Sequence, residues 1–317
     1  MKTPLYDELP RGPDGVPNAW GLFGANDSIG RLNLITSDAV VDAARLVRRG
    51  VTFAFDVAID TFDPPLDDSR GIARHRVLRD GNQDIEGLDD VLDNYFPQIA
   101  SQWDSLAHVA ASPNLFYNNR TVEDVTTGGF NTIDHVARRG IVTRGVLLDL
   151  PVFTPESRDV NHGSVAITVD ELERVRRAAG VTYSPGCAIV IRTGFLSWYR
   201  NQTSATRRKL SENLEAPGIE HSEEMARYLW ESGASAVVSD SFATEVWPPD
   251  RSGNAQPFGY LHRVLIGRLG FSIGELWDLE ALSEDSQANR VYEFLLASAP
   301  LHIPHGIGSP ANAVGIK

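Results

Sequence analysis

The sequence predicts an α/β domain with a largely buried sheet, and three observations support this. Short apolar runs such as GVLLDLP and CAIVIRTG are typical of buried strands. Segments with apolar residues at helical spacing alternate with these runs along the chain. No linker, repeat or low-complexity stretch divides the 317 residues. We therefore expect one domain, residues 36–317, with a Pro- and Gly-rich arm, residues 1–35, packed against it.

The first half of the chain begins with a helix and a strand. Residues 36–50 start with Thr, Ser and Asp, carry apolar side chains at helical spacing and end in Gly50, which predicts a helix. Residues 51–60 alternate apolar and polar side chains, as a half-buried strand does. Residues 61–95 are polar without strong periodicity, and we expect a hairpin or an active-site flap there.

The second half continues the alternation. Thr168 with Glu171 three residues later forms a capping box, so a helix is predicted up to Gly180. Two further helices and four strands are expected. The helices are HSEEMARYLWESG and YLHRVLIGRLG, and the strands are GVLLDLP, GCAIVIRTGF, ASAVVSDS and YEFLLASAPL.

The composition excludes several classes of function. A formal net charge of −13 disfavours nucleic acid, which needs a basic surface. The single cysteine, Cys187, lies in an apolar run and predicts a buried, inert thiol. No phosphate-binding glycine loop and no G-x-S-x-G motif is present. Without an apolar signal region or a run of 18 apolar residues, we expect a cytoplasmic protein that does not bind membranes.

Two pairs of residues combine a histidine with a carboxylate in apolar surroundings. In QWDSLAH, Asp104 precedes His108 by four residues, which suits either a metal ligand with a base or a helix cap with a core histidine. If a helix covers 261–269, Glu275 begins the next segment and folds back towards His262. The alternative for this second pair is an exposed helix histidine and a glutamate in a first helical turn.

The ordered set of motifs resembles the cyclase family that includes bacterial kynurenine formamidase and isatin hydrolase. The family motif H-x-G-T-H-x-D-x-P-x-H aligns with QIASQWDSLAH, so Asp104 and His108 match its Asp and last His. The family's late His and Glu match His262 and Glu275. Similar stretches, WGLFGANDSIGRLNLIT near the start and APLHIPHGIGSPANAV at the end, extend the likeness to the longer branch of the family. It implies a swivelling β/β/α domain, with a mixed sheet or partial barrel flanked by helices.

The chain departs from the family motif at the first two histidines. Gln98 and Gln102 replace them, and Leu106 stands where the proline would be. In the formamidase members two zinc ions share the Asp and the Glu, and the missing histidines hold one of these ions. The resemblance therefore implies at most one divalent ion, zinc or manganese, on Asp104, His262 and Glu275.

The same resemblance implies a metal-assisted hydrolase of a small amide, lactam or formamide bond. His108 would be the general base, and Gln102 would donate to the oxyanion. Gln98 is expected to bind substrate. An aromatic substrate is expected against walls chosen from Trp20, Phe23, Phe96, Trp103 and Trp247.

Two other functions fit the substituted motif. One is a metal-poor cyclase or dehydratase that uses His108 for proton transfer. The other is a binding protein without turnover, which the retained set of Asp104, His108, His262 and Glu275 disfavours. The resemblance further implies a homodimer or a higher homo-oligomer.

Overall fold

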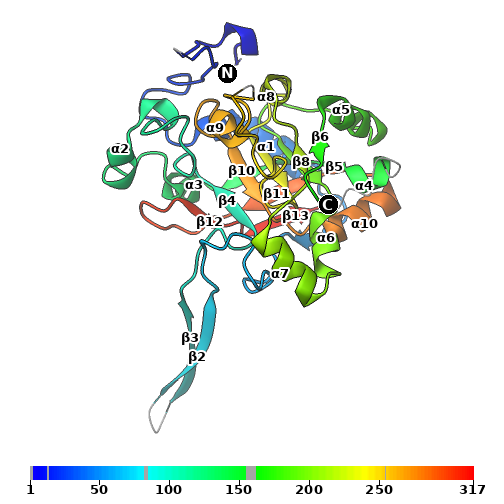
Figure 1. The fold of residues 1–317 in the computed structure, drawn as a ribbon. Helices are drawn as coiled ribbons and strands as arrows, with labels where there is room; N and C mark the ends of the chain where they lie inside the picture. Colours follow the sequence, from blue (N-terminus) through cyan, green and yellow to red (C-terminus); the bar gives the residue numbers. More distant parts are fainter. Residues whose placement is uncertain (1–2, 13, 82–84, 155–161, 254) are drawn as a thin grey trace.

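A nine-stranded sheet runs through the molecule and curls into half a barrel (Figure 1). The structure is a computed structural model that describes residues 3–12, 14–81, 85–154, 162–253 and 255–317. In spatial order the strands are β1 (Thr52–Ala54), β13 (Ala313–Ile316), β11 (Glu293–Ser298), β5 (Ile141–Asp149), β7 (Ala188–Arg192), β9 (Ala236–Ser239), β10 (Ser272–Glu275), β4 (Gln102–Asp104) and β12 (Gly308–Pro310).

The sheet is parallel at its centre and antiparallel on both sides. Strands β5, β7, β9 and β10 run parallel, whereas β11, β13 and β1 on one side and β4 and β12 on the other are antiparallel to their neighbours. All four residues of β9 are buried, as are the first four of β7. The prediction of buried strands in a mixed sheet is thus confirmed, because parallel strands are covered on both faces.

Helices cover the sheet and its ends (Figure 1). They are α1 (Ser37–Ala44), α2 (Val122–Thr126), α3 (Ile133–Arg139), α4 (Leu150–Phe153), α5 (Val169–Ala178), α6 (Phe195–Arg200), α7 (Ser204–Glu212), α8 (Glu223–Glu231), α9 (Leu261–Leu265) and α10 (Glu280–Asn289), with 3-10 turns at Tyr6–Glu8, Gly30–Leu34 and Tyr117–Asn119. The capping box of α5 is present as predicted. No helix among the described residues is both long and apolar enough to cross a membrane.

Several predicted elements are shorter than expected, among them α9, and for α1 and β1 the reason is tertiary. Helix α1 stops at Ala44, because the backbone N–H groups of Arg49 and Val51 both donate to the carbonyl of Lys317 and draw the chain to the sheet edge. Strand β1 ends at Ala54, after which the carboxylate of Asp56 accepts backbone N–H groups at 2.8 and 2.9 Å from the β12–β13 turn.

The expected hairpin is present and stands away from the body. Within the described part of the chain, strands β2 (Arg74–Gly81) and β3 (Glu86–Asp93) pair only with each other, and they extend below the sheet (Figure 1). Residues 82–84 between them lie outside the described residues. A second small sheet pairs β6 (Ala166–Ile167) with β8 (Gly218–Ile219).

The amino-terminal arm packs on the body through specific contacts. The indole of Trp230 donates to the carbonyl of Pro4 at 2.9 Å. Arg31 is fully buried and donates to the carbonyls of Ala234 and Trp230 at 2.6 and 3.1 Å. Its guanidinium lies between the rings of Trp230 and Phe271, 4.2 and 4.4 Å from their centres. The arm is thus fixed to the C-terminal end of α8.

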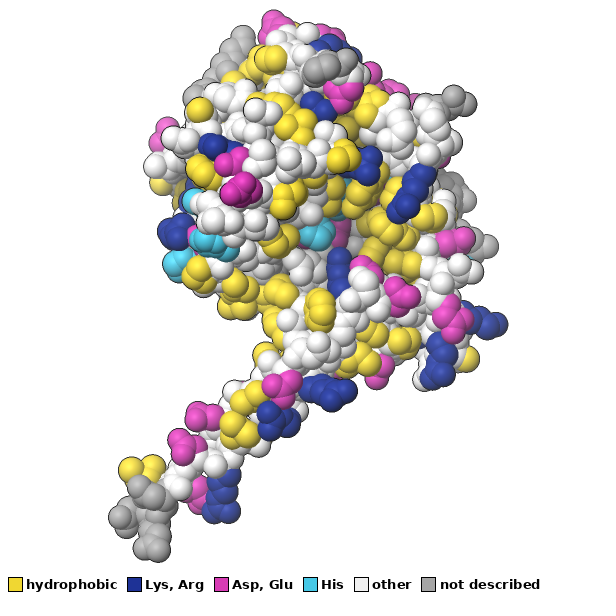
Figure 2. Space-filling model, turned by 60° about the vertical axis from the view of Figure 1, so that its left-hand side comes forward, with side chains coloured by type: hydrophobic (Ala, Val, Ile, Leu, Met, Phe, Trp, Pro, Cys, Tyr) yellow, Lys and Arg dark blue, Asp and Glu magenta, His cyan; other side chains and the backbone are white. Residues whose placement is uncertain are grey.

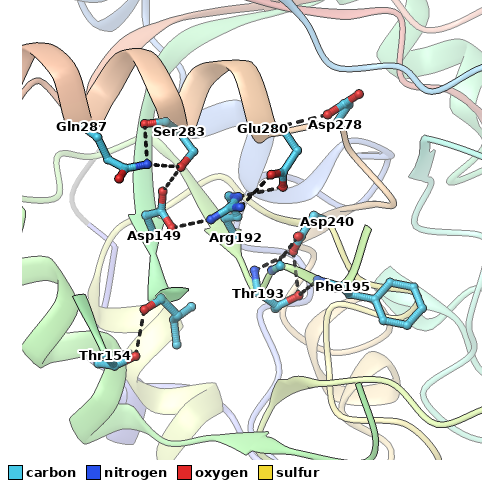
Figure 3. A network of polar contacts seen from close by, with 12 residues as sticks. Asp149, Thr154, Arg192, Thr193, Phe195, Asp240, Asp278, Glu280, Ser283 and Gln287 are labelled. Atoms are coloured by element: carbon cyan, nitrogen blue, oxygen red, sulfur yellow. Dashed lines mark hydrogen bonds and ion pairs between the residues drawn. The ribbon is translucent and has the colours of Figure 1, made fainter. Parts of the chain in front are cut away.

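A polar network fills the carboxyl ends of the central parallel strands (Figure 3). Arg192 of β7 donates to Asp149 of β5 at 2.9 Å and to both carboxylate oxygens of Glu280 on α10 at 2.7 and 2.8 Å. Asp240 accepts from the backbone and hydroxyl of Thr193, and burial raises its pKa to about 6. This network ties α10 to the sheet.

Candidate metal centre

Three polar side chains project from one face of the strand pair β4–β10. The antiparallel register places Gln102 opposite Glu275 and Asp104 opposite Ile273. Since residues two apart share a face of a strand, Gln102, Asp104 and Glu275 point the same way. All three are buried. The sequence analysis gave a helix start as one alternative for Asp104 and placed Glu275 at the start of a segment. Both residues lie in strands instead, and the pairing of these strands explains why their side chains point in the same direction.

His262 reaches the same point from α9. Its Nε2 lies 3.1 Å from Glu275 Oε1 and 3.9 Å from Asp104 Oδ2. The ligand atoms of Asp104, His262 and Glu275 all lie within 4.8 Å of one another, although the residues span more than half of the chain. His262 is 4% exposed, so the alternative of an exposed helix histidine does not hold.

Glu245, which the sequence analysis did not select, orients His262. Its carboxylate accepts the backbone N–H groups of Leu261 and His262 at 2.6 and 2.8 Å and contacts His262 Nδ1. His221 Nε2 lies 2.8 Å from its other oxygen. A carboxylate on one ring nitrogen of a histidine fixes the other nitrogen for metal binding. The only signal in the sequence was an acidic residue within the apolar stretch SFATEVW.

The donor set fits one divalent ion. Asp104 Oδ2 and Gln102 Oε1 are buried and have no hydrogen-bond partner among the described residues, which is costly unless a cation lies beside them. In a tetrahedral site with bonds of about 2.1 Å, ligand atoms are about 3.4 Å apart. The separations of 3.1 and 3.9 Å at His262 Nε2 bracket that value.

The electrostatics also indicate a site for a cation. Burial raises the pKa of Asp104 to about 6. Burial would also raise the pKa of Glu245, but His262 and His221 hold it at about 2. Burial alone would lower the pKa of His262, yet Tyr260 and Glu245 raise it well above its usual value. Excess negative charge therefore surrounds His262, and a divalent ion would replace a proton there.

The two glutamines lie beside these residues in different ways. Gln102 Nε2 donates to Glu275 Oε2 at 2.7 Å and lies 3.5 Å from Asp104 Oδ1, so its N–H groups face both carboxylates. Gln98 lies over Gly308, which is opposite Asp104 on β12. A β carbon at Gly308 would come within 2.5 Å of Gln98 Nε2, so only glycine leaves room for this amide.

His108 and Arg70 border the centre. His108 Nε2 lies 3.8 Å from Asp104 Oδ1, and its side chain is 22% exposed. Burial lowers the pKa of His108, against the opposing effect of Asp104, so the ring is a neutral base near pH 7. Arg70 donates to the carbonyl of Gln98, and its charge lowers the pKa of both Asp104 and His108. The sequence analysis did not select Arg70, which lies in the polar segment before the hairpin.

Most of the aromatic residues expected around a substrate pack or hydrogen-bond in other parts of the structure. Trp103 points to the opposite face from Asp104, where its indole donates to Ser298 and packs edge-on against Trp277 at 4.9 Å. It is fully buried in the core, and we correct its assignment as a substrate wall. Trp20 donates to the carbonyl of Gly267 at 3.0 Å and so anchors the arm. Phe23 is partly buried.

Other rings do lie near the centre. Tyr260 stacks on His262 with ring centres 5.4 Å apart, and Trp247 contacts Tyr260 edge-on. Both line a pocket of about 410 Å³. Figure 2 shows histidine, acidic and basic side chains together in a hollow above the root of the hairpin. Among the expected walls, Trp247 therefore stays a candidate.

Comparison with known proteins gave one family and several related structures. Residues 46–246 match the family model described as "Putative cyclase". A crystal structure described as that of a novel cyclase is 29% identical, with a TM-score of 0.83, and the match covers 95% of this chain and 99% of that one. None of the curated proteins matches the chain.

Two isatin hydrolase structures share the fold at lower identity. Isatin hydrolase A from Labrenzia aggregata, bound to benzyl benzoate, is 15% identical with a TM-score of 0.57, over 88% of this chain and 97% of that one. Isatin hydrolase A from Ralstonia solanacearum is 15% identical with a TM-score of 0.55, over 89% of this chain and 96% of that one. These likenesses extend over nearly the whole fold.

Proposed function

The chain belongs to the cyclase family, and on this premise we propose that it is a metal-dependent hydrolase of a small amide, lactam or formamide bond. The observation that carries the proposal is the convergence of Asp104, His262 and Glu275 from three elements on one buried point. A divalent ion held there, zinc or manganese, would supply Lewis acidity that activates water and polarises the scissile carbonyl.

The protein's own residues divide the remaining tasks. His108 is the general base: it takes a proton from the attacking water at Nε2 and returns it to the leaving nitrogen. Its neutral state, its partial exposure and its position 3.8 Å from Asp104 support this role. Glu245 holds His262 in one tautomer and orientation.

The amides and Arg70 orient the substrate. Gln102 was expected to donate to the oxyanion, but its N–H groups face Glu275 and Asp104. Its buried Oε1 is the atom without a hydrogen-bond partner in the described part of the chain, and it would accept a hydrogen bond from the attacking water or from an N–H group of the substrate. Gln98, whose amide packs against Gly308 opposite Asp104, would bind substrate from the β12 side of the centre. Arg70 adds a positive charge next to His108, which favours substrates whose products are carboxylates.

The substrate class follows from the relatives and the surrounding rings. Isatin hydrolases, as their name states, hydrolyse isatin, and two of them share this fold. Tyr260 and Trp247 supply aromatic surface next to His262. We therefore propose a small aromatic amide or lactam as substrate and a cytoplasmic location.

A panel of compounds tests this proposal. N-formyl aromatic amines, isatin-like lactams and lactones are offered to the purified chain with Zn²⁺, with Mn²⁺ and after chelation. We expect turnover of an aromatic amide or lactam that depends on the added ion. His108→Ala should lose nearly all of it and keep its bound metal, because the base is gone and the ligands remain. Turnover by His108→Ala at the wild-type rate would refute the assigned base.

The metal-poor cyclase remains the second candidate, and one contact favours it. The Gln102 amide donates to Glu275 Oε2, which leaves only Oε1 of that carboxylate for a metal. Metal analysis after gentle purification separates the two. About one tightly bound divalent ion per chain supports the hydrolase, and none, with cyclisation or dehydration of the same compounds, supports the cyclase.

A further inference from the structure

The chain between Glu245 and Leu261 forms a closed loop beside the metal centre. The carboxylate of Glu245 accepts the backbone N–H groups of Leu261 and His262 at 2.6 and 2.8 Å, so the loop begins and ends at one point. Within the loop the backbone packs tightly, because a β carbon at Gly259 would lie 2.0 Å from a carbonyl oxygen on the opposite side. Compact loops whose ends meet are frequently functional. This loop is therefore a place to look for a binding site.

The loop and the start of α9 line a pocket of about 410 Å³, which we call the loop pocket. A volume of this size is typical of sites for small molecules. Three of its walls are ring side chains and three are longer polar ones: Trp247, Pro249, Tyr260, Arg251, Gln256 and Arg263. Tyr260 also stacks on His262, with ring centres 5.4 Å apart. One ring thus connects the loop pocket with a candidate metal ligand.

The two aromatic walls of the loop pocket form a corner. Trp247 meets Tyr260 with ring centres 6.3 Å apart and the ring planes at 78°. The backbone of Trp247 is held by Ala216, to which it donates at 2.9 Å and from which it accepts at 3.2 Å. A planar ligand in such a corner contacts the face of one ring and the edge of the other, and both arrangements are favourable. The corner therefore suits an aromatic ligand.

The charged side chains that line the loop pocket are both arginines. Arg251 and Arg263 are exposed, and neither forms an ion pair within the described part of the chain. The guanidinium of Arg263 lies 5.7 Å from the centre of the Tyr260 ring, at the edge of the aromatic corner. Asp250, the acidic residue next to Arg251, accepts the backbone N–H of Ser252 at 2.8 Å. Guanidinium groups bind carboxylates through charge-assisted hydrogen bonds, so the pocket combines an aromatic corner with donors for an acidic group.

We propose that the loop pocket binds the acidic end of the substrate, which is then an aromatic amide or lactam that carries a carboxylate away from the scissile bond. The ring of the substrate lies in the corner of Trp247 and Tyr260, and Arg251 and Arg263 bind the carboxylate. These two arginines determine specificity and take no part in the reaction. The proposal rests on the proposed function for the position of the reacting bond at the metal centre, whereas binding of an aromatic acid to the pocket needs no turnover.

Kinetics with two matched compounds test the proposal. We expect kcat/KM about ten-fold higher for 4-formamidophenylacetate than for 4-formamidophenylacetamide, which has the same shape without the charge. The double variant Arg251→Gln with Arg263→Gln should lose this preference through a higher KM for the acid. The matched control, Arg174→Gln with Arg208→Gln, removes two exposed arginines from α5 and α7 and should keep it. Hydrolysis of both compounds with equal kcat/KM, or a preference that survives the pocket double variant, would overturn the proposal and leave the proposed function standing.

Equilibrium binding separates the pocket from the reaction. In calorimetric titrations, indole-3-acetate should bind the wild-type chain about ten-fold more tightly than indole-3-acetamide. The pocket double variant should bind the two compounds equally, and the control variant should behave as wild type. This pattern in a chain that turns over no amide or lactam would support the pocket and count against the proposed function. An acid that binds no more tightly than its amide would overturn the assignment of the pocket.

Discussion

Replacing Glu245 by glutamine should weaken metal binding without touching a ligand. This carboxylate accepts the backbone N–H groups of Leu261 and His262 and contacts the His262 ring at Nδ1, and His221 Nε2 lies 2.8 Å from it. An amide offers one acceptor oxygen in place of two, and its own NH₂ turns towards donors. His262 then loses the partner that fixes its tautomer.

The magnitude follows from these contacts. Loss of a carboxylate that orients a ligand histidine lowers metal affinity about 10- to 100-fold, or about 1.4–2.7 kcal/mol. Each donor that faces the replaced oxygen loses its acceptor, which costs about 1–3 kcal/mol in the free energy of unfolding. Metal affinity and stability are therefore both affected and have to be measured separately.

The assay is a competition titration of Zn²⁺ against a chromophoric chelator, on protein shown by circular dichroism to be folded. Asp240→Asn is the matched control, because Asp240 is an equally buried carboxylate that accepts backbone N–H groups and contacts none of the ligand candidates among the described residues. The control should change stability and leave zinc affinity intact. A folded Glu245→Gln protein that binds zinc within about three-fold of wild type would refute the reasoning.

Three further outcomes are expected. The double variant Gln98→His with Gln102→His should bind more metal, rising from about one towards two ions per chain in elemental analysis, since imidazole is a better zinc donor than an amide. An unchanged metal count with a ten- to thousand-fold lower kcat/KM would show instead that the two amides bind the substrate. Burial raises the pKa of Asp104 to about 6, and Tyr260 and Glu245 raise the pKa of His262, so zinc competes with protons at both groups and its affinity should fall about ten-fold per pH unit for each bound proton as the pH is lowered. Calorimetry showing the same affinity at about pH 5 and pH 7 would contradict this linkage. Arg31→Ala should lower the free energy of unfolding, measured in urea, by about 2–4 kcal/mol, because it leaves a cavity between the rings of Trp230 and Phe271. A change below about 0.5 kcal/mol would mean that the two rings close the cavity without loss of stability.

Local patterns in the sequence predicted most of the secondary structure. The strands in GVLLDLP and ASAVVSDS and the capped helix after Thr168 form where expected, because burial on both faces and helix capping act over a few residues. The lengths of α1 and β1 were overestimated. Their ends depend on hydrogen bonds from Lys317 and from the β12–β13 turn, which lie at the far end of the chain.

The candidate site was likewise predicted from the sequence only in part. The sequence by itself, through its likeness to a known motif, determined that Asp104, His108, His262 and Glu275 belong together. Only the tertiary structure decided how they meet: the strand register puts Gln102 and Glu275 face to face, and the same alternation turns Trp103 away into the core. It alone revealed Glu245, because a carboxylate 17 residues from His262 has no periodic relation to it and becomes its partner only when the chain folds back after β9. A contact of that kind depends on the path of the backbone in space, which no short stretch of sequence contains.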